Sequence, residues 1–289
     1  MYHYLKQHPE VFMPKRKEPN FFGRDMSAPY FVDDKKKYLA LFEGARPGQR
    51  VGEASVWYLF SEKAAEEIKA FSPEADIFVL IRDPVDMIYS LHSQRVYNSS
   101  EDLTDFRAAL KAEADRKKGA RLPDNRVGPV EGFFYREAAR YTAQIERYLA
   151  AFGRKRVHVI VFDDLKARPL EVYQHALQQL GVDDSFEPKM ERKNPNKRLR
   201  SRTLKRFLRG EGLVSETFRK VARTLVPSHY RKQLRGKIKS INESVEPRPP
   251  MDNQLRERLM RDFDSEVKRL NRLLGRDLAS EWGYVHKQV

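Results

Sequence analysis

The sequence predicts an α/β fold in which a parallel sheet is flanked by helices. Ile77–Ile81 is a short continuous apolar run of the kind that a parallel sheet buries on both faces, and Val157–Phe162 is a second strongly β-forming run. Segments with a helical spacing of apolar residues precede and follow both runs. Because strands that alternate with helices are joined by right-handed crossovers, we expect the strands to be parallel. The 289 residues are enough for one large domain, so we expect residues 1–289 to form a single domain.

The amino-terminal part contains short elements separated by long loops. We expect a helix at Tyr4–Gln7 and a short strand at Val11–Met13. Little regular structure is expected over residues 16–50, where six prolines and glycines occur. A short helix at Ala64–Phe71 then leads into the strand Ile77–Ile81.

Helices and strands alternate more regularly in the rest of the chain. Helices are predicted at Leu103–Lys117, which is amphipathic, and at Pro169–Leu180, which ends at Gly181. One further helix with a left-handed end at Gly153 is predicted from the spacing of Phe134, Ala138, Tyr141, Ile145 and Leu149. The last helix buries Leu255, Leu259, Phe263, Val267, Leu270 and Leu274. The proline-rich stretch Val245–Pro250 is interpreted as a connector within the domain.

The most informative local pattern lies where the strand Ile77–Ile81 ends. Pro84 suits the first position of a helix, so Arg82 is left at the carboxyl end of a strand, where open α/β sheets bind ligands. Ser90 follows two helical turns later and can direct its hydroxyl towards the same anion. An arginine fork and a hydroxyl suit a phosphate monoester. From these residues alone, a helix cap or an ion pair of Arg82 with Asp83 or Asp86 explains the pattern equally well.

This segment resembles the 3′-phosphate-binding segment of the sulfotransferases that use 3′-phosphoadenosine 5′-phosphosulfate (PAPS). In that family the Arg and Ser of an Arg-Asp/Asn-Pro…Ser segment hold the 3′-phosphate, which implies this role for Arg82 and Ser90. Further blocks resemble the family in the same order, at Tyr4–Phe22, Val51–Leu59, Tyr135–Leu165 and Leu273–Trp282. The resemblance is to bacterial members and to the carbohydrate- or heparan-sulfate-type branch. It implies a P-loop-NTPase-like parallel sheet flanked by helices.

One part of the family pattern does not occur in this sequence. A strand followed by a Lys-x-Gly-Thr-Thr type turn should lie immediately before Tyr2, where it would supply backbone N–H groups and a lysine to the phosphosulfate. No other Gly-rich phosphate loop is present. We therefore expect that the sequence is amino-terminally truncated and lacks the first core strand and half of the donor site. The alternative is a non-catalytic nucleotide- or polyanion-binding protein that has lost the transfer loop.

The resemblance also implies a catalytic base. Glu18, in Lys17-Glu18-Pro19, matches the family carboxylate that acts as base in the carbohydrate-sulfating branch, and Lys17 is expected at the donor phosphate or the acceptor. Without the resemblance, such a pair is usually solvated surface. Another branch uses a histidine as the base, and His92 and His8 are the candidates here. Local packing of His92 and helix termination at His8 explain these residues better.

Basic residues are concentrated in one part of the chain. Residues 191–240 hold 17 Lys and Arg against three Glu, which accounts for nearly all of the net charge of +15. The segment Glu191–Arg209 resembles the family's late segment, whose basic residues close over adenosine 3′,5′-bisphosphate. We expect donor contacts from this group, which contains Arg192, Lys193, Lys197, Arg198 and Arg200. For most of these residues individually, a position in a solvent-exposed segment without a ligand is the better explanation. The others could steer an anionic acceptor.

The resemblance therefore implies a sulfotransferase that moves a sulfuryl group from PAPS to a hydroxyl or amine of a carbohydrate or small-molecule acceptor and releases adenosine 3′,5′-bisphosphate. Glu53 and Tyr58 are interpreted as structural or acceptor-facing residues. The absence of cysteine excludes disulfides and thiol catalysis, and no zinc-ligand spacing occurs, so no metal is expected. Nucleic acid is a less favoured partner than the donor nucleotide and the acceptor, because no nucleic-acid-binding motif accompanies the concentration of basic residues. Neither a membrane span nor an apolar leader is recognisable, which favours the cytoplasm.

Overall fold

The structure is a computed structural model that describes residues 1–191, 197–199, 243–245 and 248–284. Arg192, Lys193 and Arg200 lie outside the described residues, so their expected donor contacts stay predictions. Lys197 and Arg198 are described only as backbone, within β5 (Lys197–Leu199). The prediction of a single domain over residues 1–289 and the expected upstream phosphate loop also stay predictions.

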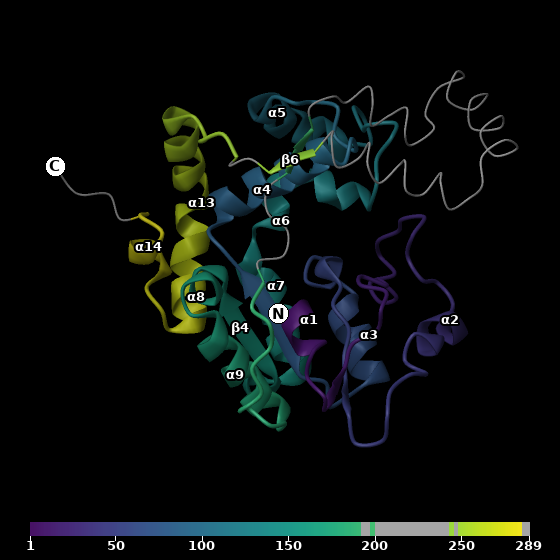
Figure 1. Cartoon of the computed structure of the whole chain (residues 1–289). Helices are drawn as coiled ribbons and strands as arrows, with labels where there is room; N and C mark the ends of the chain where they lie inside the picture. The colour runs from purple at the N-terminus through teal and green to yellow at the C-terminus, as the bar shows by residue number, and fades with distance from the viewer. Residues whose placement is uncertain (192–196, 200–242, 246–247, 285–289) are drawn as a thin grey trace, which may run out of the picture.

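Two parallel strands lie at the centre of the fold. β3 (Ile77–Ile81) pairs with β4 (Val157–Val161) in an unbroken register from Ile77 opposite Val157 to Ile81 opposite Val161. In the view of Figure 1, α13 (Asn253–Leu274) lies to one side of these strands and α3 (Ala64–Phe71) to the other, and residues of both helices share one core with the strands. The predicted parallel pairing is therefore confirmed, and the chain has a mixed α/β fold.

Burial of β3 on both faces was a wrong prediction for the described part of the chain. Val79 and Ile81 are 5% and 2% exposed and belong to the main core, whereas Leu80 on the opposite face is 40% exposed. Successive side chains of a strand point to opposite faces, and the core helices cover the face of Val79 and Ile81. The other face is left partly open by the residues that the structure describes.

The described strands form three separate two-stranded sheets rather than one continuous sheet. β1 (Val11–Phe12) pairs in parallel with β2 (Arg50–Val51), and β5 pairs antiparallel with β6 (Glu243–Val245). α1 (Tyr2–Leu5) and β1 pack against α9 (Pro169–Leu180) through Tyr2, Leu5 and Tyr173. The α/β class is thus confirmed, while a P-loop-NTPase-like arrangement stays a prediction.

The loop predicted over residues 16–50 contains a helix, α2 (Lys35–Ala40). Asp34 caps it by accepting the Lys37 N–H at 2.7 Å. Tyr38 of this helix is 4% exposed and stacks on Phe21 with ring centroids 4.3 Å apart. The prediction was wrong because a side-chain cap and an aromatic contact distant in sequence stabilise this short helix, and neither produces a periodic pattern.

The remaining helices largely follow the predicted order. α4 (Pro84–Tyr97) follows β3, and α5 (Phe106–Lys117) starts three residues later than expected because Asp105 accepts the N–H groups of Arg107 and Ala108. Short elements complete the fold: η1 (Val56–Tyr58), η2 (Val130–Phe133), η3 (Arg154–Arg156), α8 (Phe162–Ala167) and α14 (Leu278–Glu281). No helix among the described residues is both long enough and apolar enough to cross a membrane.

The helix predicted across residues 134–149 is divided into α6 (Tyr135–Ala138) and α7 (Tyr141–Phe152). Glu266 of α13 accepts the backbone N–H of Thr142 at 2.7 Å, so an acceptor from a distant helix satisfies the first turn of α7. Gly153 ends α7 with a positive φ of 75°, but its ψ of 163° is not the left-handed helical value that we expected. The division therefore results from tertiary packing against α13.

Candidate functional site

The junction between β3 and α4 forms as predicted. Asp83 caps α4 by accepting the Asp86 N–H at 2.8 Å, and Pro84 takes the first helical position. Arg82 lies between strand and helix, 3.4 Å from an Asp86 carboxylate oxygen and with its guanidinium 5.3 Å from the ring centre of Phe162. Burial raises the pKa of the Asp83 carboxyl to about 6. The ion pair of Arg82 with Asp86, which was the alternative explanation of this pattern, is therefore present.

Ser90, on the same helix, binds an arginine from the far end of the chain. The Nη2 of Arg248 donates a hydrogen bond to Ser90 Oγ at 2.8 Å, and its guanidinium lies 5.2 Å from the ring centre of Tyr89. Tyr89 OH in turn donates to the Pro249 carbonyl at 3.0 Å, which fixes the adjacent backbone on α4. Burial, followed by the positive charge of Arg82, lowers the pKa of Arg248. Arg82, Ser90 and Arg248 thus form one group, which we name the arginine–serine cup.

The cup and the charged residues next to it together carry more positive than negative charge. Arg256 of α13 donates to Asp86 at 2.8 Å, so three guanidinium groups, of Arg82, Arg248 and Arg256, face the two carboxylates of Asp83 and Asp86. Burial acts to raise the pKa of Asp86, but the hydrogen bonds and charges of Arg256 and Arg82 outweigh it and lower this pKa. The Nε of Arg248 is buried and has no hydrogen-bond partner among the residues that the structure describes. This arrangement can accept a small dianion such as a phosphate monoester.

Sequence reasoning missed Arg248 and Arg256. Arg248 was interpreted as part of a connector, and its hydrogen-bond partner lies 158 residues away. The only sequence signal is an arginine among prolines, in Pro247-Arg248-Pro249-Pro250. Proline fixes φ and stiffens this stretch, which suits a segment that presents one side chain at a defined position.

The segment with the predicted base has a strained backbone. Glu18 and Asn20 have positive φ values of 57° and 49°, and Glu18 also precedes Pro19, where the helical regions are disfavoured. Each such residue costs about 1–3 kcal/mol and persists only where its surroundings fix it. Lys17 Nζ forms an ion pair with Glu18 Oε1 at 2.5 Å, with both side chains about one-third exposed, at 37% and 30%. Lys17 therefore contacts the predicted base.

A buried carboxylate lies next to this segment. Glu53 accepts hydrogen bonds from Tyr58 OH at 2.5 Å, Ser55 Oγ at 2.9 Å and Tyr38 OH at 3.5 Å. Burial raises the pKa of Glu53 despite these hydrogen bonds, and the neighbouring charge of Glu18 raises it further. The interpretation of Glu53 and Tyr58 as structural residues agrees with these contacts.

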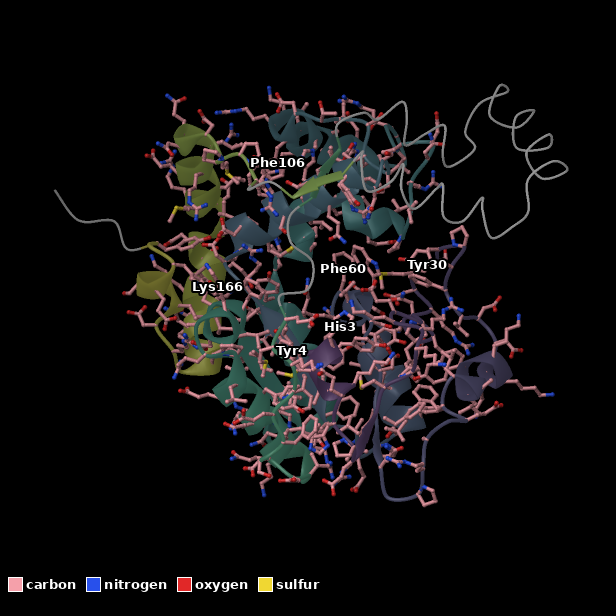
Figure 2. All side chains as sticks on the ribbon, in the orientation of Figure 1. His3, Tyr4, Tyr30, Phe60, Phe106 and Lys166 are labelled. Carbon is pink, nitrogen blue, oxygen red and sulfur yellow. The ribbon has the colours of Figure 1, made fainter. Side chains whose placement is uncertain are left out.

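The structure does not bring the two groups of predicted site residues into contact. Within the described part of the chain, no hydrogen bond or ion pair joins Lys17 or Glu18 to the arginine–serine cup. The charge of Glu18 is near enough to Tyr30 to raise the pKa of that tyrosine. Figure 2 labels Tyr30 on the side of the molecule opposite α13. The cup lies instead on α4 and the segment that precedes α13.

Both candidate histidines are buried, His92 by local packing as expected and His8 by contacts with the distant residues Asp183 and Phe186. His92 is 3% exposed, its Nε2 lies 2.8 Å from the Leu103 carbonyl, and its ring packs against Phe106, which is labelled in Figure 2. Burial lowers the pKa of His92. His8 is 2% exposed, with Nε2 2.8 Å from the Asp183 carbonyl and Nδ1 accepting the Glu10 N–H. The described residues also contain no group of three or more His, Asp or Glu placed to hold a metal ion.

Comparison with known proteins identifies sulfotransferases as structural neighbours. A sulfotransferase from Alicyclobacillus acidocaldarius superposes with a TM-score of 0.69 and 27% sequence identity, covering 96% of this chain and 91% of that one. A sulfotransferase domain from the curacin biosynthetic pathway superposes with a TM-score of 0.41 and 16% identity, covering 65% and 70%. No protein-family model and no curated protein matches the chain. The first comparison shows a sulfotransferase fold over nearly the whole chain and supports sulfuryl transfer in general.

Proposed function

We propose that this chain is a PAPS-dependent sulfotransferase that acts on a hydroxyl or amine of a carbohydrate or small-molecule acceptor. The observation that carries the proposal is the arginine–serine cup at the carboxyl end of β3, in a chain that shares its fold with a sulfotransferase. The family resemblance assigns Arg82 and Ser90 to the 3′-phosphate of the donor, and Arg248 adds a second guanidinium to that position.

The residues of the cup fit a phosphate dianion. Two guanidinium groups and a hydroxyl supply directed donors. The buried Nε of Arg248, which no described residue binds, is a further donor that a phosphate oxygen would satisfy. The backbone of β5, which contains Lys197 and Arg198, pairs with β6, and β6 ends three residues before Arg248. This pairing brings part of the basic segment close to the cup and supports the expected donor contacts.

The reaction requires a base for the acceptor proton. The acceptor oxygen or nitrogen attacks sulfur and forms a new bond to it as the bond from sulfur to the 5′-phosphate oxygen breaks, and adenosine 3′,5′-bisphosphate leaves. Glu18 takes the acceptor proton in this proposal, and its ion pair with Lys17 orients the carboxylate. Positioning and charge stabilisation supply most of the acceleration, as in phosphoryl transfer.

Calorimetric titration with adenosine 3′,5′-bisphosphate, together with release of this product from PAPS in the presence of candidate acceptors, tests the proposal. We expect the wild-type chain to bind the nucleotide, Arg82→Met to lose binding, and Glu18→Gln to bind normally but transfer no sulfuryl group. The same measurements are made on a version extended upstream through the expected Lys-x-Gly-Thr-Thr loop. No binding even to this folded, extended chain would refute the donor assignment. Binding without transfer by the extended chain would indicate the non-catalytic alternative.

A further inference from the structure

Three consecutive backbone N–H groups follow the strained Glu18–Pro19 pair, and side-chain hydroxyls bind all of them. Asn20 N–H donates to Ser55 Oγ at 3.1 Å. The N–H groups of Phe21 and Phe22 donate to Tyr58 OH at 2.9 and 3.3 Å. Two hydroxyls therefore hold the backbone directly after the predicted base.

Both hydroxyls are bound in turn by one carboxylate. Tyr58 OH donates to Glu53 Oε1 at 2.5 Å, and Ser55 Oγ donates to Glu53 Oε2 at 2.9 Å. A hydroxyl has one proton to donate and two lone pairs to accept with. Because an ionised carboxylate only accepts, it fixes the proton of each hydroxyl on its own side and leaves the lone pairs directed at the amides.

The segment of residues 53–58, which contains this carboxylate and both hydroxyls, also binds the backbone of Glu18 itself. The backbone N–H of Glu18 donates to the carbonyl of Ala54, between Glu53 and Ser55, at 3.0 Å. The strained backbone from Glu18 to Asn20 is therefore held on both sides of Pro19 by residues 53–58.

We infer that Glu53 is the positioning residue for Glu18: through the hydroxyls of Ser55 and Tyr58, its carboxylate holds the backbone that presents the base. This inference rests on the proposed function of Glu18. Glu53 does not touch the acceptor in this role. It acts by keeping the base within the narrow range of positions that proton transfer requires.

Amide hydrogen exchange tests the anchoring separately from activity. We expect Glu53→Gln, which replaces one acceptor oxygen by a donor, to accelerate exchange at Asn20, Phe21 and Phe22 by about fivefold or more. Ser55→Ala should accelerate Asn20 alone, and Tyr58→Phe should accelerate Phe21 and Phe22. These milder variants keep the test decisive if Glu53→Gln does not fold.

The matched control is Glu67→Gln. The Glu67 carboxylate accepts the Gly23 N–H at 2.8 Å, so this change removes the same charge and one acceptor oxygen beside a nearby amide without touching the 18–22 backbone. We expect Glu53→Gln to lower the turnover number by about a hundredfold. Affinity for adenosine 3′,5′-bisphosphate should stay within twofold of wild type, and Glu67→Gln should retain wild-type turnover.

Unchanged exchange at all three amides in Glu53→Gln would overturn the inference, as would an equal loss of turnover in Glu67→Gln. If even the extended chain binds no nucleotide and transfers no sulfuryl group, the proposed function fails. In that case the exchange pattern alone still decides whether Glu53 holds this backbone.

Discussion

Replacing Arg248 by methionine tests whether the cup holds the donor phosphate. Methionine keeps an unbranched side chain over Tyr89 but removes the guanidinium that donates to Ser90 at 2.8 Å. A hydrogen bond to a charged group contributes about 1.5–3 kcal/mol. Because Arg248 is only partly buried, we take a value of about 2 kcal/mol, which corresponds to about thirtyfold in the dissociation constant.

The assay is calorimetric titration of adenosine 3′,5′-bisphosphate at two salt concentrations. Arg272→Met is the matched control, because it removes the same charge from α13 at a position 16 residues beyond Arg256, about 24 Å along the helix axis. We expect Arg248→Met to weaken binding about thirtyfold and Arg272→Met to change it by less than twofold. If Arg248→Met binds like wild type while Arg82→Met does not bind, Arg248 takes no part in holding the phosphate.

Three further predictions concern the stability of the fold. Asp83→Asn should stabilise the fold by up to about 3 kcal/mol near pH 8. Because the folded pKa of Asp83 rises from 3.8 to about 6, its ionised form destabilises the fold as pH increases through that interval, so the gain in urea unfolding experiments should disappear near pH 4. Glu101→Gln should cost about 3–5 kcal/mol in the same experiment, because the fully buried Arg116 guanidinium loses the carboxylate 2.7 Å away and keeps only the exposed carboxylate of Asp102 at 3.7 Å; a loss below about 1 kcal/mol would contradict this. Gly132→Ala should prevent folding or lower the melting temperature strongly, since its Cβ would lie 1.5 Å from the Nη2 of the buried Arg95; normal melting would show that Arg95 moves freely.

Where a local pattern is sufficient to form an element, the sequence predicted it well. Helix α9 has the expected bounds because Pro169 starts it and Gly181 ends it in the left-handed conformation. Strand β3 and the Pro84 start of α4 also form as predicted, which leaves Arg82 at the end of a strand. Proline, glycine and apolar spacing act over a few residues, so these features can be read without knowledge of the fold.

Where distant contacts stabilise an element, the sequence was insufficient. Helix α2 depends on the stacking of Tyr38 on Phe21, and the break between α6 and α7 depends on Glu266 from α13. The solvent exposure of the β3 face that carries Leu80 depends on which helices cover that face. Short segments gain too little from their own hydrogen bonds to be specified locally, so packing decides their conformation.

The sequence by itself predicted the parallel α/β class and the positions of Arg82 at the end of a strand and of Ser90 on the helix that follows, and the family resemblance made Glu18 the candidate base. Only the tertiary structure showed that Arg248 binds Ser90 and that one carboxylate, Glu53, holds the hydroxyls that bind the backbone after Glu18. The physical reason is that hydrogen bonds and charge interactions act over a few ångströms. Residues 158 positions apart acquire them only when the folded chain brings them together.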